Sequence, residues 1–126
     1  MLVVSIPQFV QGLTNAKVDL TTTDVTTLYT APSSADFNSS VINSIIVSND
    51  SGSSDTITLT ITNGSDVFNL FQVKAVAANT SIELLTRDLI LQSAEILKVT
   101  AATANRLHVI ASVQEFALHR TPQSAL

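Results

Sequence analysis

The sequence predicts an all-β protein, an antiparallel β-sandwich of jelly-roll type with about eight strands. Three observations carry this prediction. Residues 56–62, within the segment 55–62, alternate strictly between threonine and large aliphatic residues, which is the period of a strand with one face exposed to solvent. Asn63-Gly64 follows at once, and this is the strongest short hairpin signal. Turn signals then recur along the chain while no helical stripe appears, which is typical of a sandwich.

The most regular strand is expected over 55–62. Ile57, Leu59 and Ile61 point to one side, and the threonines between them point to the other. Asn and Gly both tolerate positive φ, so the chain is expected to turn at Asn63-Gly64 and return as a strand over 65–73. The aliphatic side should face the core and the threonine side should face water.

The remaining strands are expected at 25–30, 41–48, 81–85, 89–91, 95–102 and 106–116. The strand 41–48 has Val41, Ile45 and Val47 on one face and Ile42 and Ile46 on the other, so it is predicted to be central and covered on both sides. In the last strand, one face is formed by Leu107, Val109, Ala111 and Val113. Loops rich in Asn, Asp and Ser separate these segments.

The length of 126 residues fits one domain, with the sandwich expected over residues 21–116. Residues 1–20 are expected to form an N-terminal arm and residues 117–126 a polar C-terminal tail. The arm is unusually aliphatic for a solvated segment, so it is predicted to bind a partner; the alternative is that it forms the first strand of its own sandwich. The partner-binding candidates are Leu2, Val3, Val4, Ile6, Phe9, Val10 and Leu13.

Composition argues against several classes of protein. Cysteine is absent, which leaves no disulfide, thiolate or iron–sulfur chemistry. The net charge is −4, and the six cationic residues are scattered singly, so no nucleic-acid partner is expected. There is no apolar run of about 18 residues, so no membrane partner is expected either. The apolar N-terminus has no basic region and is interrupted by Ser5 and Pro7, which is a poor signal peptide.

No catalytic constellation stands out, so no enzyme activity is expected. The two histidines are His108, expected to point outward from a strand, and His119, in the tail. A nucleophile needs an adjacent base, and no motif brings a serine to either histidine. Asp50, Asp55 and Asp66 lie in loops that could offer oxygen ligands to calcium, but turn formation explains them adequately. No catalytic, cofactor-binding or metal-binding residue and no cofactor is predicted.

Several segments together resemble a known class of protein. They are LYTAP at 28–32, VINSIIVSN at 41–49, TITLTIT at 56–62, ANTSIELL at 78–85, LKVTA at 97–101 and RLHVIASVQE at 106–115. Over residues 24–116, this pattern resembles small β-sandwich virion proteins of tailed bacteriophages, of the capsid decoration, or cement, type. The arm and the tail fall outside the resemblance.

The resemblance implies a non-enzymatic structural protein that is made in the host cytoplasm and ends up on the capsid surface of the virion. Its implied partners are the major capsid protein and further copies of itself, with a homotrimer expected. A tail, baseplate, head–tail connector or fibre-attachment component is the alternative. A carbohydrate-binding module is a third hypothesis, but it needs exposed aromatic residues, and the chain has no Trp and only one Tyr.

Overall fold

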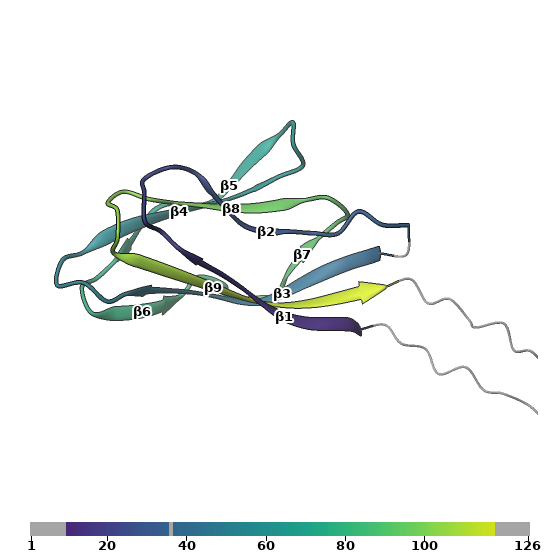
Figure 1. Ribbon diagram of the computed structural model, residues 1–126, viewed down its shortest axis with the longest axis horizontal. Helices are drawn as coiled ribbons and strands as arrows, with labels where there is room; N and C mark the ends of the chain where they lie inside the picture. Colours follow the sequence, from purple (N-terminus) through teal and green to yellow (C-terminus); the bar gives the residue numbers. More distant parts are fainter. Residues whose placement is uncertain (1–9, 36, 118–126) are drawn as a thin grey trace, which may run out of the picture.

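The computed structural model describes residues 10–35 and 37–117, which form nine strands in two antiparallel sheets packed face to face (Figure 1). This confirms the all-β sandwich. The described residues contain no helix, and accordingly none that is long and apolar enough to cross a membrane.

Each sheet has four strands in a row. The first sheet has the order β1-β9-β3-β6, and the short β7 also pairs with β3; the second has the order β2-β8-β4-β5. The strands of the first sheet are β1 (Val10–Asp19), β9 (Leu107–Ala117), β3 (Phe37–Asn49), β6 (Thr80–Glu83) and β7 (Leu89–Leu91). Those of the second sheet are β2 (Thr26–Thr30), β8 (Ile96–Ala101), β4 (Asp55–Thr62) and β5 (Val67–Val76).

The pairing of the strands is that of one long hairpin rolled into two sheets. β4 pairs with β5, β3 with β6, β2 with β8 and β1 with β9. Counting outward from the β4–β5 turn, each strand that precedes the turn in the chain therefore pairs with a strand that follows it. Such a rolled hairpin is the jelly-roll topology that the sequence predicts, with β7 as an additional short strand.

The turn at the centre of this hairpin is the one expected at Asn63-Gly64, although its loop is longer than two residues. Thr62 pairs with Val67, so four residues connect the strands. The Asn63 side-chain oxygen accepts hydrogen bonds from the backbone N–H groups of Ser65 and Asp66, both at 2.9 Å. Gly64 has a φ of 101°, a conformation that glycine adopts without strain.

The core between the sheets is almost entirely aliphatic. Ile57 and Leu59 of β4 are fully buried, while their threonine neighbours are partly exposed, as the alternation predicts. The four inward residues expected in β9 are also buried. The other fully buried large side chains are Leu20, Ile42, Ile45, Leu91, Leu97, Val47, Val76 and Val99.

The expected faces of β3 are confirmed for Ile45, Ile46 and Val47 but are wrong for Val41 and Ile42, because a β-bulge between these two groups changes the phase. Ile42 pairs with Val113 of β9, but the next pair is Ser44 with Ser112, so Asn43 is an extra residue. Alternation shifts by one there, and Ile42 and Ile45 therefore both point into the core with zero exposure. β3 is not covered on both faces: Ile46 is 41% exposed on the outside.

The predicted N-terminal arm also needs correction. Residues Val10–Asp19 form β1, which pairs with β9 along its length, from Val10 opposite Phe116 to Asp19 opposite His108. This part of the segment is the edge strand of its own sandwich, the alternative stated above. The physical reason is that β9 offers a free row of backbone hydrogen-bonding groups, which Val10–Asp19 satisfies. The residues before Val10 and those after Ala117 lie outside the described part of the chain.

Candidate interaction surfaces

The outer face of the first sheet carries a regular array of side chains in four rows across the strands. The register places these rows as Asp19–His108–Ser48–Ser81, Lys17–Ile110–Ile46–Glu83, Asn15–Ser112–Ser44 and Leu13–Gln114–Val41–Ile90. Residues in one row are direct cross-strand neighbours on one face. We call this array the A face.

Four large aliphatic side chains lie exposed on the A face. Leu13 is 74% exposed, Ile90 62%, Ile46 41% and Ile110 39%. Ile46 and Ile110 are directly opposite each other, whereas Leu13 and Ile90 occupy the two ends of another row. Single exposed aliphatic residues need no explanation, but four on one sheet face, two of them directly opposite each other, make the A face a candidate interaction surface.

The charges of the A face lie at its edges. Exposed Lys17, on β1, and exposed Glu83, on β6, stand at opposite ends of the row that holds the two isoleucines. The Glu83 carboxylate also accepts hydrogen bonds from the Ser44 hydroxyl and from the backbone N–H groups of Ile45, at 2.7 Å, and Leu85, at 3.2 Å. Glu83 thereby satisfies the backbone beside the Asn43 bulge.

His108 lies at the end of the A face between two carboxylates. Its Nδ1 is 2.9 Å from Asp19 Oδ1, and its Nε2 is 3.1 Å from Asp50 Oδ2. The prediction that His108 points outward is confirmed. Because each ring nitrogen faces a carboxylate, neither is directed at the hydroxyl of Ser48, its neighbour in the row. This geometry differs from a catalytic triad, in which one ring nitrogen faces the nucleophile.

A shallow hollow of about 380 Å³ lies on the A face beside the bulge. Its lining includes Leu13 and Asn15 of β1, Asn43 of β3, and Ser112 and Gln114 of β9. The extra residue in β3 and the small Ser112 side chain leave this part of the face lower than its surroundings. The hollow is therefore part of the same exposed surface, the A face.

The outer face of the second sheet carries a second concavity, a groove of about 370 Å³. Thr58, Thr60 and Thr100 lie along it, and exposed Val25 and Val67 also line it. In Figure 1, the β4–β5 hairpin projects from the body of the sandwich. The groove combines threonine hydroxyls with methyl groups and contains a single cation, Lys98.

A buried polar cluster links the two sheets. The Tyr29 hydroxyl, from β2, donates to Glu115 Oε2 of β9 at 2.5 Å and lies 2.7 Å from the Ser40 hydroxyl of β3. Burial, followed by the hydrogen bond to Glu115, raises the pKa of Tyr29 from 10.0 to about 12. The phenol therefore stays protonated at neutral pH, so the cluster is a structural tie between the sheets.

The loop aspartates considered as calcium ligands do not converge. Asp50 faces His108, and buried Asp55 accepts from the backbone N–H groups of Thr56 and Thr103. Asp66 lies at the separate β4–β5 turn. Over residues 10–35 and 37–117, no cluster of three or more His, Cys, Asp or Glu side chains could hold a metal ion.

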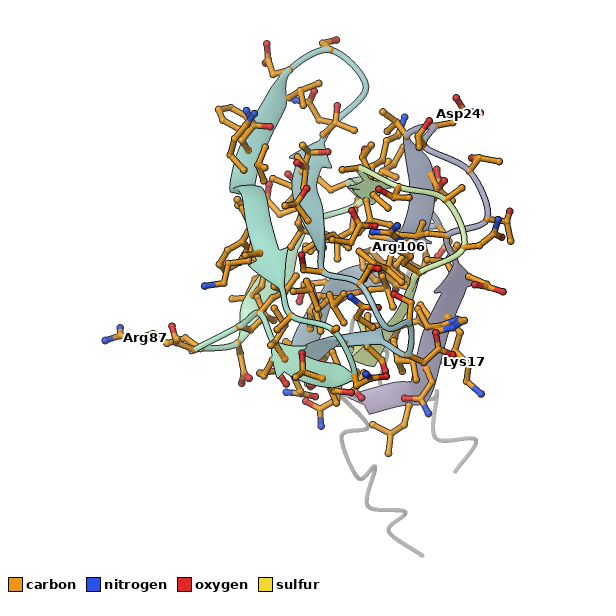
Figure 2. The ribbon with its side chains drawn as sticks, turned by 90° about the vertical axis from the view of Figure 1, so that its left-hand side faces the viewer. Lys17, Asp24, Arg87 and Arg106 are labelled. Carbon is orange, nitrogen blue, oxygen red and sulfur yellow. The ribbon has the colours of Figure 1, made fainter. Side chains whose placement is uncertain are left out.

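The cationic residues of the described chain are dispersed. Figure 2 shows Lys17, Arg87 and Arg106 on separate parts of the molecule. The Arg106 guanidinium donates to the backbone carbonyl of Ser54 at 2.8 Å. Their separation gives no basic patch of the kind that tracks a phosphate backbone.

The predicted partner-binding residues are only partly described. Leu2, Val3, Val4, Ile6 and Phe9 lie outside the described residues, as does the second histidine, His119. Val10 begins β1, and Leu13 is exposed on the A face.

Ile46, Ile90 and Ile110 were not predicted from the sequence as surface residues. The signal for Ile110 was present, since it sits out of phase with the inward face of β9. Ile46 was missed because the strand 41–48 was expected to be covered on both faces, whereas its outer face is exposed.

Comparison with known proteins gives a likeness in fold. No family model matches the chain, and no curated protein matches it. Among solved structures, two of a pentameric capsid protein isolated from metagenomic phage sequences resemble it, each with a TM-score of 0.50 and 17% sequence identity. The match covers 87% of this chain and 68% or 66% of those chains. At this identity, the likeness establishes the shared fold.

Proposed function

We propose that this chain is a structural protein of a phage virion, a capsid decoration protein that binds the outer surface of the head and stabilises it. The observation that carries the proposal is a sandwich whose broad A face is aliphatic and hydroxyl-rich. The shared fold with a pentameric phage capsid protein supports it, as does the resemblance of the sequence to cement proteins. The role needs surface complementarity and no chemistry.

The proposed partners are the major capsid protein and further copies of this chain. Low charge supports close packing of many copies, because self-repulsion is weak at a net charge of −4. The resemblance implies a homotrimer, and the structural neighbours, which are pentameric, suggest a five-fold ring as the alternative. Light scattering of the purified chain measures its mass and distinguishes the two.

Location on the particle tests the proposed role. Antibodies raised against the purified chain would be applied to virions that carry this protein and viewed by electron microscopy. A decoration protein gives label over the whole head and many copies per particle. Label confined to one vertex or to the tail would support the second candidate, a tail, baseplate, connector or fibre-attachment component, and would overturn the first.

A further inference from the structure

We propose that the A face binds the A face of a second copy of this chain, related by a two-fold axis that runs parallel to the strands between β9 and β3. A two-fold contact requires a surface that is complementary to itself. The four rows of the A face provide that complementarity.

Rotation about this axis reverses each row from left to right and places it against the same row of the second copy. Ile110 then faces Ile46 of the second copy, and Leu13 faces Ile90 of the second copy. Lys17 meets Glu83 of the second copy, and the same ion pair forms again on the other side of the axis. Ile90 also approaches the hollow beside Leu13, where the bulge leaves room for it.

The charges and apolar groups favour this axis over the other two-fold arrangement. A two-fold axis parallel to the rows would place each strand against the same strand of the second copy. It would also reverse the order of the rows. Leu13 would then lie against Asp19, which would place an aliphatic side chain on a carboxylate. Only the axis parallel to the strands pairs aliphatic with aliphatic and cation with anion.

The size of the A face sets the strength of the contact. Four strands about 4.8 Å apart over about 20 Å of length cover roughly 400 Å² per copy, or about 800 Å² in total. Stable interfaces bury about 1,200–2,000 Å². The contact is therefore weak between free molecules and becomes occupied where copies are concentrated, as on a particle surface. It joins copies in pairs and leaves the sheet edges free for three-fold or five-fold contacts.

Disulfide trapping tests the geometry, and the chain suits it because it has no cysteine of its own. Leu13→Cys and Ile90→Cys variants, one of them tagged, would be mixed at high concentration under mild oxidation. The expected result is a disulfide-linked dimer containing one of each. Leu13→Cys alone should give little dimer, because the two copies of Leu13 lie on opposite sides of the axis.

The matched control replaces Ile90→Cys by Val67→Cys, because Val67 is 64% exposed but lies on the second sheet. Circular dichroism checks that each variant is folded. If folded Leu13→Cys with Ile90→Cys yields no more dimer than the Val67 control, the proposal is wrong. Efficient linkage of Leu13→Cys to itself would overturn this axis.

A charge reversal tests the ion pair separately. Lys17→Glu, introduced into the trapping pair, should lower the yield of dimer by about three- to tenfold, because two rim pairs become repulsive. Lys74→Glu makes the same change in net charge at an exposed residue of β5 and should leave the yield unchanged. Equal yields for the two variants would contradict the predicted ion pair.

The inference deepens the self-association in the proposed function, but its test is independent of the virion. Trapping reports on the purified chain, whereas antibody labelling reports its place on the particle. If disulfide trapping fails but the antibody labels the whole head, only the proposed A-face contact is wrong. If disulfide trapping succeeds but the antibody labels the tail, only the proposed decoration role is wrong.

Discussion

Tyr29 brings a hydroxyl group into a core that is mostly aliphatic. It is the only tyrosine in the chain, and its hydroxyl joins β2 of one sheet to β3 and β9 of the other through Ser40 and Glu115. Glu115 is partly buried, and an acceptor in such a place that loses its donor leaves part of its desolvation cost uncompensated. The cluster therefore fixes how the two sheets align at this end of the sandwich.

Replacing Tyr29→Phe should lower the free energy of unfolding by about 1–3 kcal/mol, because Glu115 loses its donor. Urea unfolding at neutral pH measures this change. Ser112→Ala is the matched control, because it also removes one side-chain hydrogen bond, the 3.3 Å contact with Asn15, but on the partly exposed A face. A cost for Tyr29→Phe no larger than that of the control would contradict the role of the cluster.

The same residue predicts a dependence of stability on alkaline pH. The pKa of Tyr29 is raised from 10.0 to about 12 in the folded state, so the unfolded chain releases this proton first. The stabilisation is fully present below pH 10 and is lost as the pH rises toward 12. The unfolding midpoint of the wild type should fall more steeply over this window than that of Tyr29→Phe. Parallel curves would show that the tyrosine does not contribute.

At the scale of strands, regular alternation could be predicted from sequence, while bulges could not. The inward face of β9 follows period two, and so do Ile57 and Leu59 of β4, so these buried residues were identified correctly. At the end of β4 the prediction was wrong, because Ile61 is partly exposed and Thr62 is buried. The bulge at Asn43 has no sequence signal of its own, because it depends on Glu83, 40 residues away along the chain, accepting from the backbone at Ile45. Long-range contacts of this kind override local pattern.

β5 contains the clearest backbone strain. Its pairing with β4 shifts register twice, once between Ile57 and Leu59 and again between Leu59 and Thr60. At the first shift, Val73 has a φ of 50°, which a β-branched residue adopts only at a cost. Its N–H donates to the Thr58 hydroxyl at 3.1 Å, which holds the strand in this bent form.

Replacing Val73→Asn should raise the free energy of unfolding by about 1 kcal/mol, because asparagine tolerates this conformation. Thermal melting measures the gain. Val67→Asn is the control, since Val67 is an equally accessible valine in the same strand but does not have a positive φ. A loss of stability at Val73 as large as that at Val67 would show that the backbone strain is not relieved.

For the whole molecule, the topology could be anticipated from one signal. Asn63-Gly64 marks the centre of the rolled hairpin, and the strands on either side pair outward from it. The arm boundary at residue 20 could not be placed, because only Asn15–Leu20 alternates between polar and apolar residues, whereas residues 10–14 do not. Only the pairing of Val10–Asp19 with β9 decides between a strand and an arm. The A face could not be derived either, since it needs the register of all five strands of its sheet.

Two truncations should separate the strand from the segment before it. Removing residues 1–9 should leave the melting temperature near that of the full chain, because β1 is retained, but should weaken binding to capsids that lack the protein. Removing residues 1–19 should lower the melting temperature strongly, because it leaves β9 as an unpaired edge. Melting and co-sedimentation with capsids measure the two effects. Unfolding of the shorter truncation would contradict the predicted role in assembly.

The pairing of β1 with β9 gives the molecule two unlike poles. Val10 lies opposite Phe116, so both ends of the described chain leave the sandwich at the same pole (Figure 1). At the other pole, the Asn105 N–H donates to the Leu20 carbonyl and Arg106 contacts Ser54, which gathers three loops there. A partner attached through either terminal segment would therefore hold the domain by one pole and leave the loops at 50–54 and 102–106 facing away. A peptide inserted into those loops would be displayed outward, whereas a fusion to either end would compete with the attachment.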